Sequence, residues 1–184
     1  MMPVGPLMIE HRLIERMIAV IKKKTELMKK GERIDTRFIE EAVDFIRVYA
    51  DRCHHGKEEE ILFRDLEKKN ISPDHRRSMG ELTEEHRIAR GRTKKIVSLN
   101  NRYLDGDDSV VSDLLAELEA LASMYPPHIE KEDRHFFIPV MDYFSAEEQA
   151  SMMEEENDFD RRFIHEVYQD KVTAREGEVG GHVR

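Results

Sequence analysis

Four of the nine histidines in this 184-residue sequence fall within stripes of apolar residues that recur every three or four positions. These four are His11, His55, His86 and His128. The spacing is that of one helix face, so the pattern predicts that each imidazole points into a helical core. A buried imidazole needs partners for its ring nitrogens, and a bound metal ion is a partner that several histidines can share. The sequence therefore predicts a metal site built from several helices.

Two glutamates follow predicted inward histidines at the i, i+4 spacing, which places both side chains on one helix face. They are Glu59, four residues after His55, and Glu132, four residues after His128. Four imidazoles and two carboxylates form a nitrogen and oxygen donor set, and the carboxylates could bridge two ions. This set suits iron or manganese more than a metal that prefers soft ligands, and zinc is less expected.

The neighbouring His54 is expected to face solvent. An α-helix drawn through it places Arg47, Asp51, Glu58 and Asp65 on the same face. Because that face is charged throughout, we expect it to be hydrated and to lie away from the metal site.

Helix-forming residues dominate the chain, and no stretch shows the alternation of a β-strand. The predicted helices cover residues 7–30, 35–69, 73–104, 109–143, with an interruption at Pro126-Pro127, and 145–169. Gly31 and Gly106 mark turns, and Ser72 and Ser145 are expected N-caps. We expect an all-α fold, an up-down antiparallel four-helix bundle with an appended C-terminal helix, in one domain (1–171) followed by a flexible tail (172–184).

The loop positions predict that the four histidines lie at one height in such a bundle. In neighbouring antiparallel helices, two residues lie level when they are equally far from the connecting loop. With loop centres near the predicted turns, the four imidazoles lie within about two residues of a common level, at a rise of about 1.5 Å per residue. Glu59 and Glu132 both lie one turn further toward the same end.

Composition excludes several other classes of protein. The chain carries 30 basic and 39 acidic residues, a net charge of −9, which argues against nucleic-acid binding. The single cysteine, Cys53, excludes an internal disulfide and a cysteine-rich zinc site. No apolar run is long enough to span a membrane, and the first residues do not form a signal peptide. We therefore expect a soluble, cytoplasmic protein without a membrane partner.

The order of the predicted ligands resembles that of a known family. The pattern His11 … His55-x-x-x-Glu59 … His86 … His128-x-x-x-Glu132 is similar to that of the hemerythrin-like, or HHE cation-binding, domain. The resemblance covers residues 7–143 and implies a four-helix bundle around a non-haem, oxo-bridged di-iron centre. It implies Glu59 and Glu132 as the bridging carboxylates.

The sequence departs from oxygen-carrying hemerythrin in two places. That protein has a second histidine on its third helix, whereas here Leu82 and Arg90 stand one turn either side of His86. It also uses a His-x-x-x-x-Asp spacing on its last helix. Asp133 fits that spacing, so Asp133 and Glu132 are alternative ligands.

The resemblance implies a protein that binds or senses a small ligand such as O2, NO or peroxide. Two alternatives stay open. One is a di-iron enzyme of redox or nitrosative stress, which turns over peroxide or NO or donates iron for repair. The other is a metal-stabilised regulatory module. A sensor would need a signalling or redox partner, which the sequence does not identify.

Other residues near the predicted site have ordinary interpretations. His75 shares a stripe with His86 but lies about 16 Å along the helix, too far for the same ion. His135 is expected near the core edge, and Cys53 is interpreted as an unreactive helix residue. Tyr125, one turn before His128, could line a ligand pocket or simply pack in the core.

Overall fold

The computed structural model describes the backbone of residues 2–180 and, within the last helix, the side chains of residues 146–163 and of Val167. The described residues contain no β-strand, so the all-α prediction is confirmed. In chain order the elements are α1 (Val4–Lys29), α2 (Thr36–Phe45), η1 (Ile46–His55), η2 (Glu58–Phe63), α3 (Arg64–Leu66), α4 (Pro73–Leu104), η3 (Asp108–Val110), α5 (Val111–Lys131), η4 (Glu132–Phe136), α6 (Phe137–Val140), η5 (Met141–Tyr143) and α7 (Ala146–Gly180). Segments η1, η2 and η4 are π-helical, and η3 and η5 are short 3-10 turns.

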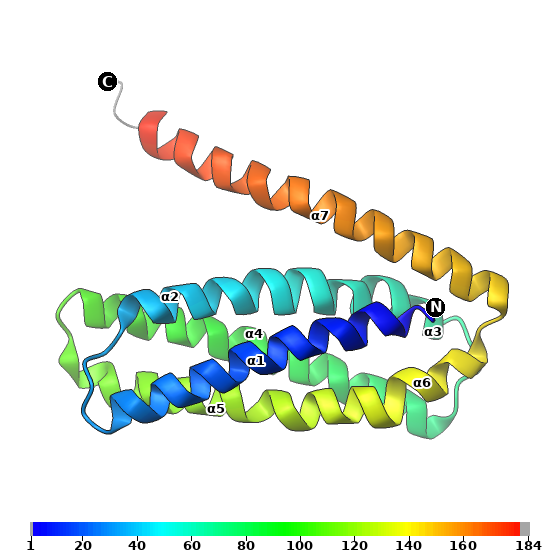
Figure 1. The fold of residues 1–184 in the computed structure, drawn as a ribbon, viewed down its shortest axis with the longest axis horizontal. Helices are drawn as coiled ribbons and strands as arrows, with labels where there is room; N and C mark the ends of the chain where they lie inside the picture. The colour runs from blue at the N-terminus through cyan, green and yellow to red at the C-terminus, as the bar shows by residue number, and fades with distance from the viewer. Residues whose placement is uncertain (1, 181–184) are drawn as a thin grey trace.

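Four long helical segments lie along a common direction (Figure 1). They are α1, the run from α2 to α3, α4, and the run from α5 to α6. Consecutive segments point in opposite directions and are joined by short turns (Figure 1). The chain then reverses once more, and α7 passes back across the second segment at an angle before it leaves the bundle (Figure 1). Contacts between α7 and both η1 and η2 hold it there.

The predicted helix ends agree with the local hydrogen bonds. Ser72 caps α4, because its Oγ accepts a hydrogen bond from the N–H of His75 at 3.2 Å. Ser145 and Glu148 form the predicted reciprocal capping box at the start of α7, with distances of 3.2 and 2.9 Å. Gly31 follows α1 with a φ of 104°, a conformation that strongly favours glycine.

The second segment is not a regular α-helix. It is α-helical from Thr36 to Phe45 and then π-helical over most of the stretch from Ile46 to Phe63. A π-helix pairs residues five apart instead of four, so each of its turns takes in about one additional residue. The face that points inward therefore shifts along the sequence relative to an α-helix drawn through the same residues.

Two other expectations about helix limits differ from the structure. Helix α5 continues through Pro126 and Pro127, so the expected interruption is absent. Helix α7 extends to Gly180, past the predicted end at residue 169 and through most of the predicted tail. Residues 181–184 of that tail lie outside the described residues.

Buried apolar residues form two clusters, one toward each end of the bundle. The first contains Ile14, Ala50, Ala89 and Leu121, and the second contains Leu7, Leu62, Leu82 and Phe136. In the four long segments, about two to three helical turns separate the residues of one cluster from those of the other. Those turns carry His11, His55, His86 and Glu132, and His128 lies one residue before the last member of the first cluster, Ile129, so a polar layer divides the core.

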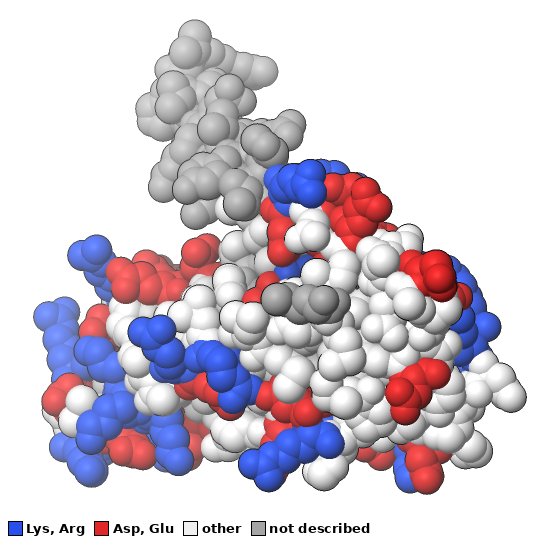
Figure 2. All heavy atoms as spheres, turned by 45° about the vertical axis from the view of Figure 1, so that its right-hand side comes forward, with Lys and Arg blue, Asp and Glu red and all other residues white. Residues whose placement is uncertain are grey.

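The surface is charged but mixed in sign. On the face in Figure 2, acidic and basic side chains alternate with uncharged ones and do not form a single basic patch. Exposed ion pairs such as Lys29–Glu119 and Arg87–Glu84 are part of this pattern. Within the described residues, no helix combines the length and apolar character needed to cross a lipid bilayer.

Helix α7 packs closely on the second segment at Gly56. A Cβ atom placed on Gly56 would lie 2.9 Å from the tip of the Phe159 ring, which is closer than normal packing allows. The absence of a side chain at residue 56 therefore lets the two helices approach one another. This accounts for a glycine inside a helix, where it costs about 1 kcal/mol relative to alanine.

We expect Gly56→Val to loosen α7, because the valine side chain overlaps the Phe159 ring. Amide hydrogen exchange over residues 146–163 should become faster, while exchange in α4 and α5 stays unchanged. Gly80→Val is the matched control, since a Cβ at this position in α4 has no neighbour within 4 Å. Equal exchange in α7 for both variants would show that the close approach does not hold the helix.

Candidate metal centre

Five histidines and two glutamates converge in the polar layer between the two apolar clusters. They form two groups, and within each group one ligand atom per residue lies within 4.8 Å of all the others. The first group is His55, His86 and His128, and the second is His11, His54, Glu58 and Glu132. All seven residues are buried, with at most 5% of the surface of any of them exposed.

The structure brings together five of the six residues predicted from the sequence. His11 comes from α1, His55 from η1, His86 from α4, and His128 and Glu132 from α5 and the start of η4. The predicted histidines lie about equally far from their connecting loops in sequence. In the structure they lie in one polar layer.

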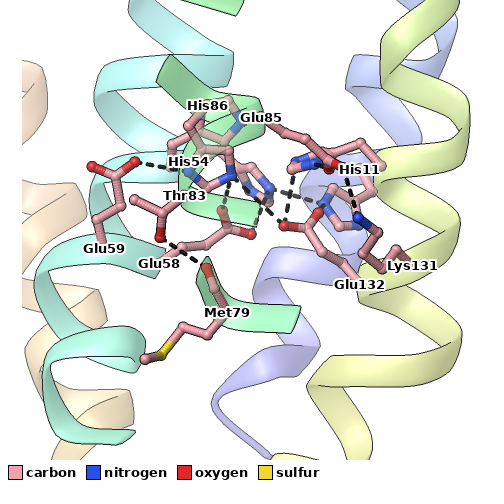
Figure 3. Close-up of polar contacts among 12 residues, drawn as sticks. His11, His54, Glu58, Glu59, Met79, Thr83, Glu85, His86, Lys131 and Glu132 are labelled. Atoms are coloured by element: carbon pink, nitrogen blue, oxygen red, sulfur yellow. Dashed lines mark hydrogen bonds and ion pairs between the residues drawn. The ribbon is translucent and has the colours of Figure 1, made fainter. Parts of the chain in front are cut away.

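Two predictions for the second segment were wrong. His54 was expected to face solvent, but its side chain is only 1% exposed and lies beside His11, with 2.9 Å between their Nε2 atoms. Glu59 was expected to point inward, but it is 28% exposed and points away from the centre of the cluster (Figure 3). Glu58 takes the inward position, with no exposed surface. The π-helical winding of η1 and η2 is the physical reason, because it turns residues 54 and 58 toward the core.

Glu58 lies between the two groups and faces one with each oxygen. Its Oε1 is 3.2 Å from Nε2 of His54, and its Oε2 is 3.3 Å from Nε2 of His86. His54 and Glu58 are four residues apart on one helix face, the spacing assigned in the sequence to His55 and Glu59.

Glu132 repeats this arrangement from the opposite side of the cluster (Figure 3). Its Oε2 is 3.2 Å from Nε2 of His11, and its Oε1 is 3.3 Å from Nε2 of His128 and 3.8 Å from Nε2 of His86. The two carboxylates therefore connect the two groups in parallel. Asp133, the alternative to Glu132, points elsewhere and contacts Nδ1 of His11 at 2.7 Å.

The inward atoms of this cluster lack hydrogen bonds. All four oxygens of Glu58 and Glu132, and Nε2 of His86 and His128, are buried and form no hydrogen bond of normal geometry with any described residue. Buried polar atoms without partners cost several kcal/mol in apolar surroundings, depending on the reference state. Cations placed between the carboxylates and the imidazoles would satisfy all six atoms together, so the residues present fit a pair of metal ions.

Comparison with known proteins agrees with this geometry. The family model described as hemerythrin HHE cation binding domain matches residues 2–138. The chain belongs to the hemerythrin HHE family. The match covers all seven clustered residues and ends before α7.

Three curated mycobacterial proteins are also similar to this hemerythrin-family chain. They are uncharacterized protein Mb2018 of Mycobacterium bovis and uncharacterized proteins MT2051 and Rv1995 of two Mycobacterium tuberculosis strains. Each is 25% identical over 178 residues, which cover 95% of this chain and 69% of the relative. No solved structure gives a significant match.

Each of the five histidines in this hemerythrin domain is oriented by a carboxylate at its outer nitrogen. The Nδ1 contacts are His11–Asp133 at 2.7 Å, His54–Glu10 at 2.8 Å, His55–Asp51 at 3.4 Å, His86–Glu59 at 2.7 Å and His128–Glu85 at 2.7 Å. In a neutral imidazole, a carboxylate at Nδ1 accepts its N–H, which leaves Nε2 with a lone pair directed into the cluster. The outer carboxylates thus select the tautomer that can bind a metal ion.

A layer of cations surrounds those carboxylates in turn. Arg90 donates to Asp51 at 2.7 Å and to Glu59 at 2.9 Å. Lys131 donates to Glu85 at 2.6 Å. Arg12 pairs with Asp133 and Lys57 pairs with Glu10 in the same way. The charges therefore alternate outward from the imidazoles, and each layer holds the next in place.

Charge distinguishes His55 from two neighbouring histidines of the cluster, His54 and His86. Burial alone lowers the pKa of His54, but the carboxylates of Glu58 and Glu10 outweigh it and raise the pKa to about 10. Burial likewise lowers the pKa of His86, yet Glu132 and Glu59 raise it to about 9. The pKa of His55 falls well below its usual value, because burial is reinforced by the neighbouring His86 and His54. His55 is thus held as a neutral imidazole, the form that binds metal.

The remaining residues singled out from the sequence lie outside the cluster. His75 contacts the Tyr143 hydroxyl at 2.8 Å, and His135 is exposed. Burial raises the pKa of the Cys53 thiol to about 12, so it stays protonated near neutral pH and is a poor nucleophile. Tyr125 is 3% exposed, and its hydroxyl has no hydrogen-bond partner among the described residues.

A second buried charge cluster joins α7 to the metal centre. The Lys57 side chain has no exposed surface and pairs with Glu10 on α1 and with Asp160 on α7, the latter at 2.9 Å. Glu10 in turn contacts Nδ1 of His54. Nearby Glu156 is 2% exposed, and neither of its oxygens has a hydrogen-bond partner among the described residues.

Glu85→Gln should weaken metal binding by about tenfold to a hundredfold, the usual effect of removing a carboxylate that orients a histidine ligand. Both ions should still bind when metal is saturating, because Glu85 contacts only Nδ1 of His128. Competition with a chelator measures the affinity. Glu81→Gln is the matched control, since Glu81 pairs with the same Lys131 but contacts none of the clustered histidines. Equal affinities in the two variants would contradict an orienting role for Glu85.

Glu156→Gln should make the protein more stable than the unchanged chain, increasingly so with pH. Burial raises the pKa of Glu156 from 4.5 to about 8, so the unfolded chain releases this proton at lower pH than the folded one. The contribution of Glu156 to stability is therefore complete below about pH 4.5 and declines until about pH 8. The difference in Tm between the two proteins should grow over that range, reach about 5 °C or more, and level off above it. A difference that is constant with pH would contradict a buried, protonated Glu156.

Proposed function

We propose that this chain is a non-haem di-iron protein of the hemerythrin type, with an up-down four-helix bundle as its scaffold, that binds or senses a small ligand such as O2, NO or peroxide. The observation that carries the proposal is the pair of buried carboxylates, Glu58 and Glu132, each directed at both histidine groups and each without hydrogen bonds. Such a carboxylate is the side chain needed to bridge two cations.

The donor atoms support iron as the metal. The cluster offers five imidazole nitrogens and two carboxylates, and Cys53 is not part of it. This set lacks the soft thiolates that characterise many structural zinc sites. It also contains imidazole nitrogens, whereas the sites that hold magnesium or calcium are built from oxygen ligands. Mixed imidazole and carboxylate ligation is well suited to iron.

Each group supplies a different share of the ligands. His55, His86 and His128 would hold one ion and His11 and His54 the other, while Glu58 and Glu132 would be common to both. Bound iron would supply a redox-active Lewis acid at which a small ligand can bind. These seven side chains would leave two bound ions short of full coordination shells, so positions would remain for an exogenous ligand.

The chain's own residues have two tasks around such a pair. The outer carboxylates fix the ring orientations and tautomers, and the apolar clusters on both sides keep bulk water away from the layer. A polar layer that is rigid and shielded from bulk water would hold the ions in place and leave room only for a small ligand.

The decisive experiment compares iron content across single variants of the layer. Protein loaded with ferrous iron without air and then exposed to air should contain two iron ions and show a near-ultraviolet band. His54→Ala should reduce the content, and Glu58→Ala should reduce it most, because Glu58 faces both groups. Glu59→Ala should still reach two ions at saturating iron, since Glu59 contacts only Nδ1 of His86 within the cluster.

His75→Ala is the control, because His75 is half-buried and its side chain contacts Tyr143 and not the cluster. Circular dichroism of each metal-free variant establishes that it is folded. If Glu58→Ala binds two iron ions and Glu59→Ala does not, the assignment of the bridging carboxylate is wrong. If the unchanged chain binds one zinc ion or no metal, the di-iron proposal fails.

A further inference from the structure

A pocket beside the metal centre opens to solvent between the second segment and α4. It has a volume of about 290 Å³, and its floor is formed by His55, Ala89 and Tyr125. These same three residues also line a much smaller cavity, of about 10 Å³, together with Glu85, Met124 and His128. The two spaces adjoin at His55, Ala89 and Tyr125, and we refer to them together as the path to the three-histidine group.

The rim of the outer pocket carries an excess of positive charge. Arg47, Arg52, Arg90 and Lys94 line it, against the single carboxylate of Asp51. Asp51 is bound to Arg90, which also pairs with Glu59. Arg47 and Lys94 are exposed and have no ion-pair partner among the described residues. Uncompensated cations around a concave opening raise the local concentration of anions and their rate of entry.

The inner end of this path offers a hydrogen-bond donor. The Tyr125 hydroxyl is buried and has no partner among the described residues. A neutral phenol can donate a hydrogen bond to an anion but cannot repel it. The ring of Tyr125 lies 6.4 Å from those of both His55 and His128, measured between centroids.

The size of the inner cavity limits what can reach this hydroxyl. A volume of about 10 Å³ is near the minimum for one water molecule, so even an anion of two or three heavy atoms needs the surrounding side chains to move. Tetrahedral anions such as phosphate are too large for it.

We propose that this path is an entrance and binding site for small inorganic monoanions, such as hydroperoxide, superoxide or nitrite, with Arg47 and Lys94 attracting the anion and Tyr125 donating a hydrogen bond to it. The inference rests on the proposed function, because the path matters for ligand chemistry only if iron occupies the centre. It adds a preference for charged ligands over neutral diatomic ones.

The test uses azide as the probe on iron-loaded protein whose metal content has been measured first. Azide binding is followed by calorimetry at several salt concentrations, and the infrared band of bound azide reports its surroundings. Arg47→Gln combined with Lys94→Gln should weaken azide binding at low salt by about threefold to tenfold and reduce its salt dependence. Lys22→Gln with Lys23→Gln removes the same charge from exposed positions on α1 and should leave binding unchanged.

Tyr125→Phe retains the ring and removes only the hydroxyl. It should weaken azide binding by about fivefold, the usual effect of one hydrogen bond, and shift the infrared band. Binding of neutral NO should be the same in the rim and control pairs. Equal azide affinity and salt dependence in the rim and control pairs, or equal effects on azide and NO, would overturn the anion path. An unchanged band in Tyr125→Phe would overturn the role of the hydroxyl, whereas failure to load iron would count against the proposed function instead.

Discussion

The structure depends on the burial of two carboxylates and five imidazoles in one layer of a helical core. Glu58 and Glu132 have no exposed surface, and apolar clusters lie on both sides of them. Ionised groups in such a place require opposite charge close by, and the histidines can provide only part of it. The pKa of Glu132 is held well below its usual value by His128 and His11 despite burial. Four helical segments must therefore meet at one height for the layer to exist at all.

The surrounding charges follow from that requirement. Each imidazole directs Nε2 inward only if something accepts its Nδ1–H, and each accepting carboxylate is steadied by an arginine or lysine. The high content of charged residues, 38% of the chain, is thus partly a structural necessity and not only a means of hydration. The net charge of −9 includes residues such as Glu10 and Glu85, which act on the centre without being directed into it.

The sequence predicted most of the helices and five of the seven clustered residues, because α-helical periodicity is regular and turn residues mark the loops. It failed at His54, Glu58 and Glu59 for one reason. An α-helical wheel cannot represent a π-helical stretch, whose hydrogen bonding is decided by packing between helices and not by local propensity. Two adjacent histidines followed by three glutamates were the only available signal, since either histidine has a glutamate four residues later. The role of the outer carboxylates was also missed, because four of the five come from helices distant in sequence from their histidine; only Asp51 lies one turn from its partner, His55.

Helix α7 lies beyond the residues that the family model matches, but it packs against them. The match ends at residue 138, yet Phe159 packs over Gly56, and Asp160 reaches Lys57, whose other partner, Glu10, holds Nδ1 of His54. Helix α7 is therefore linked to the seven clustered residues by packing and by a chain of buried ion pairs. A protein shortened to the shared domain would leave a buried lysine with one carboxylate instead of two, and would expose a groove along its second segment. Transferring the centre to another scaffold would accordingly require this helix as well as the seven clustered side chains.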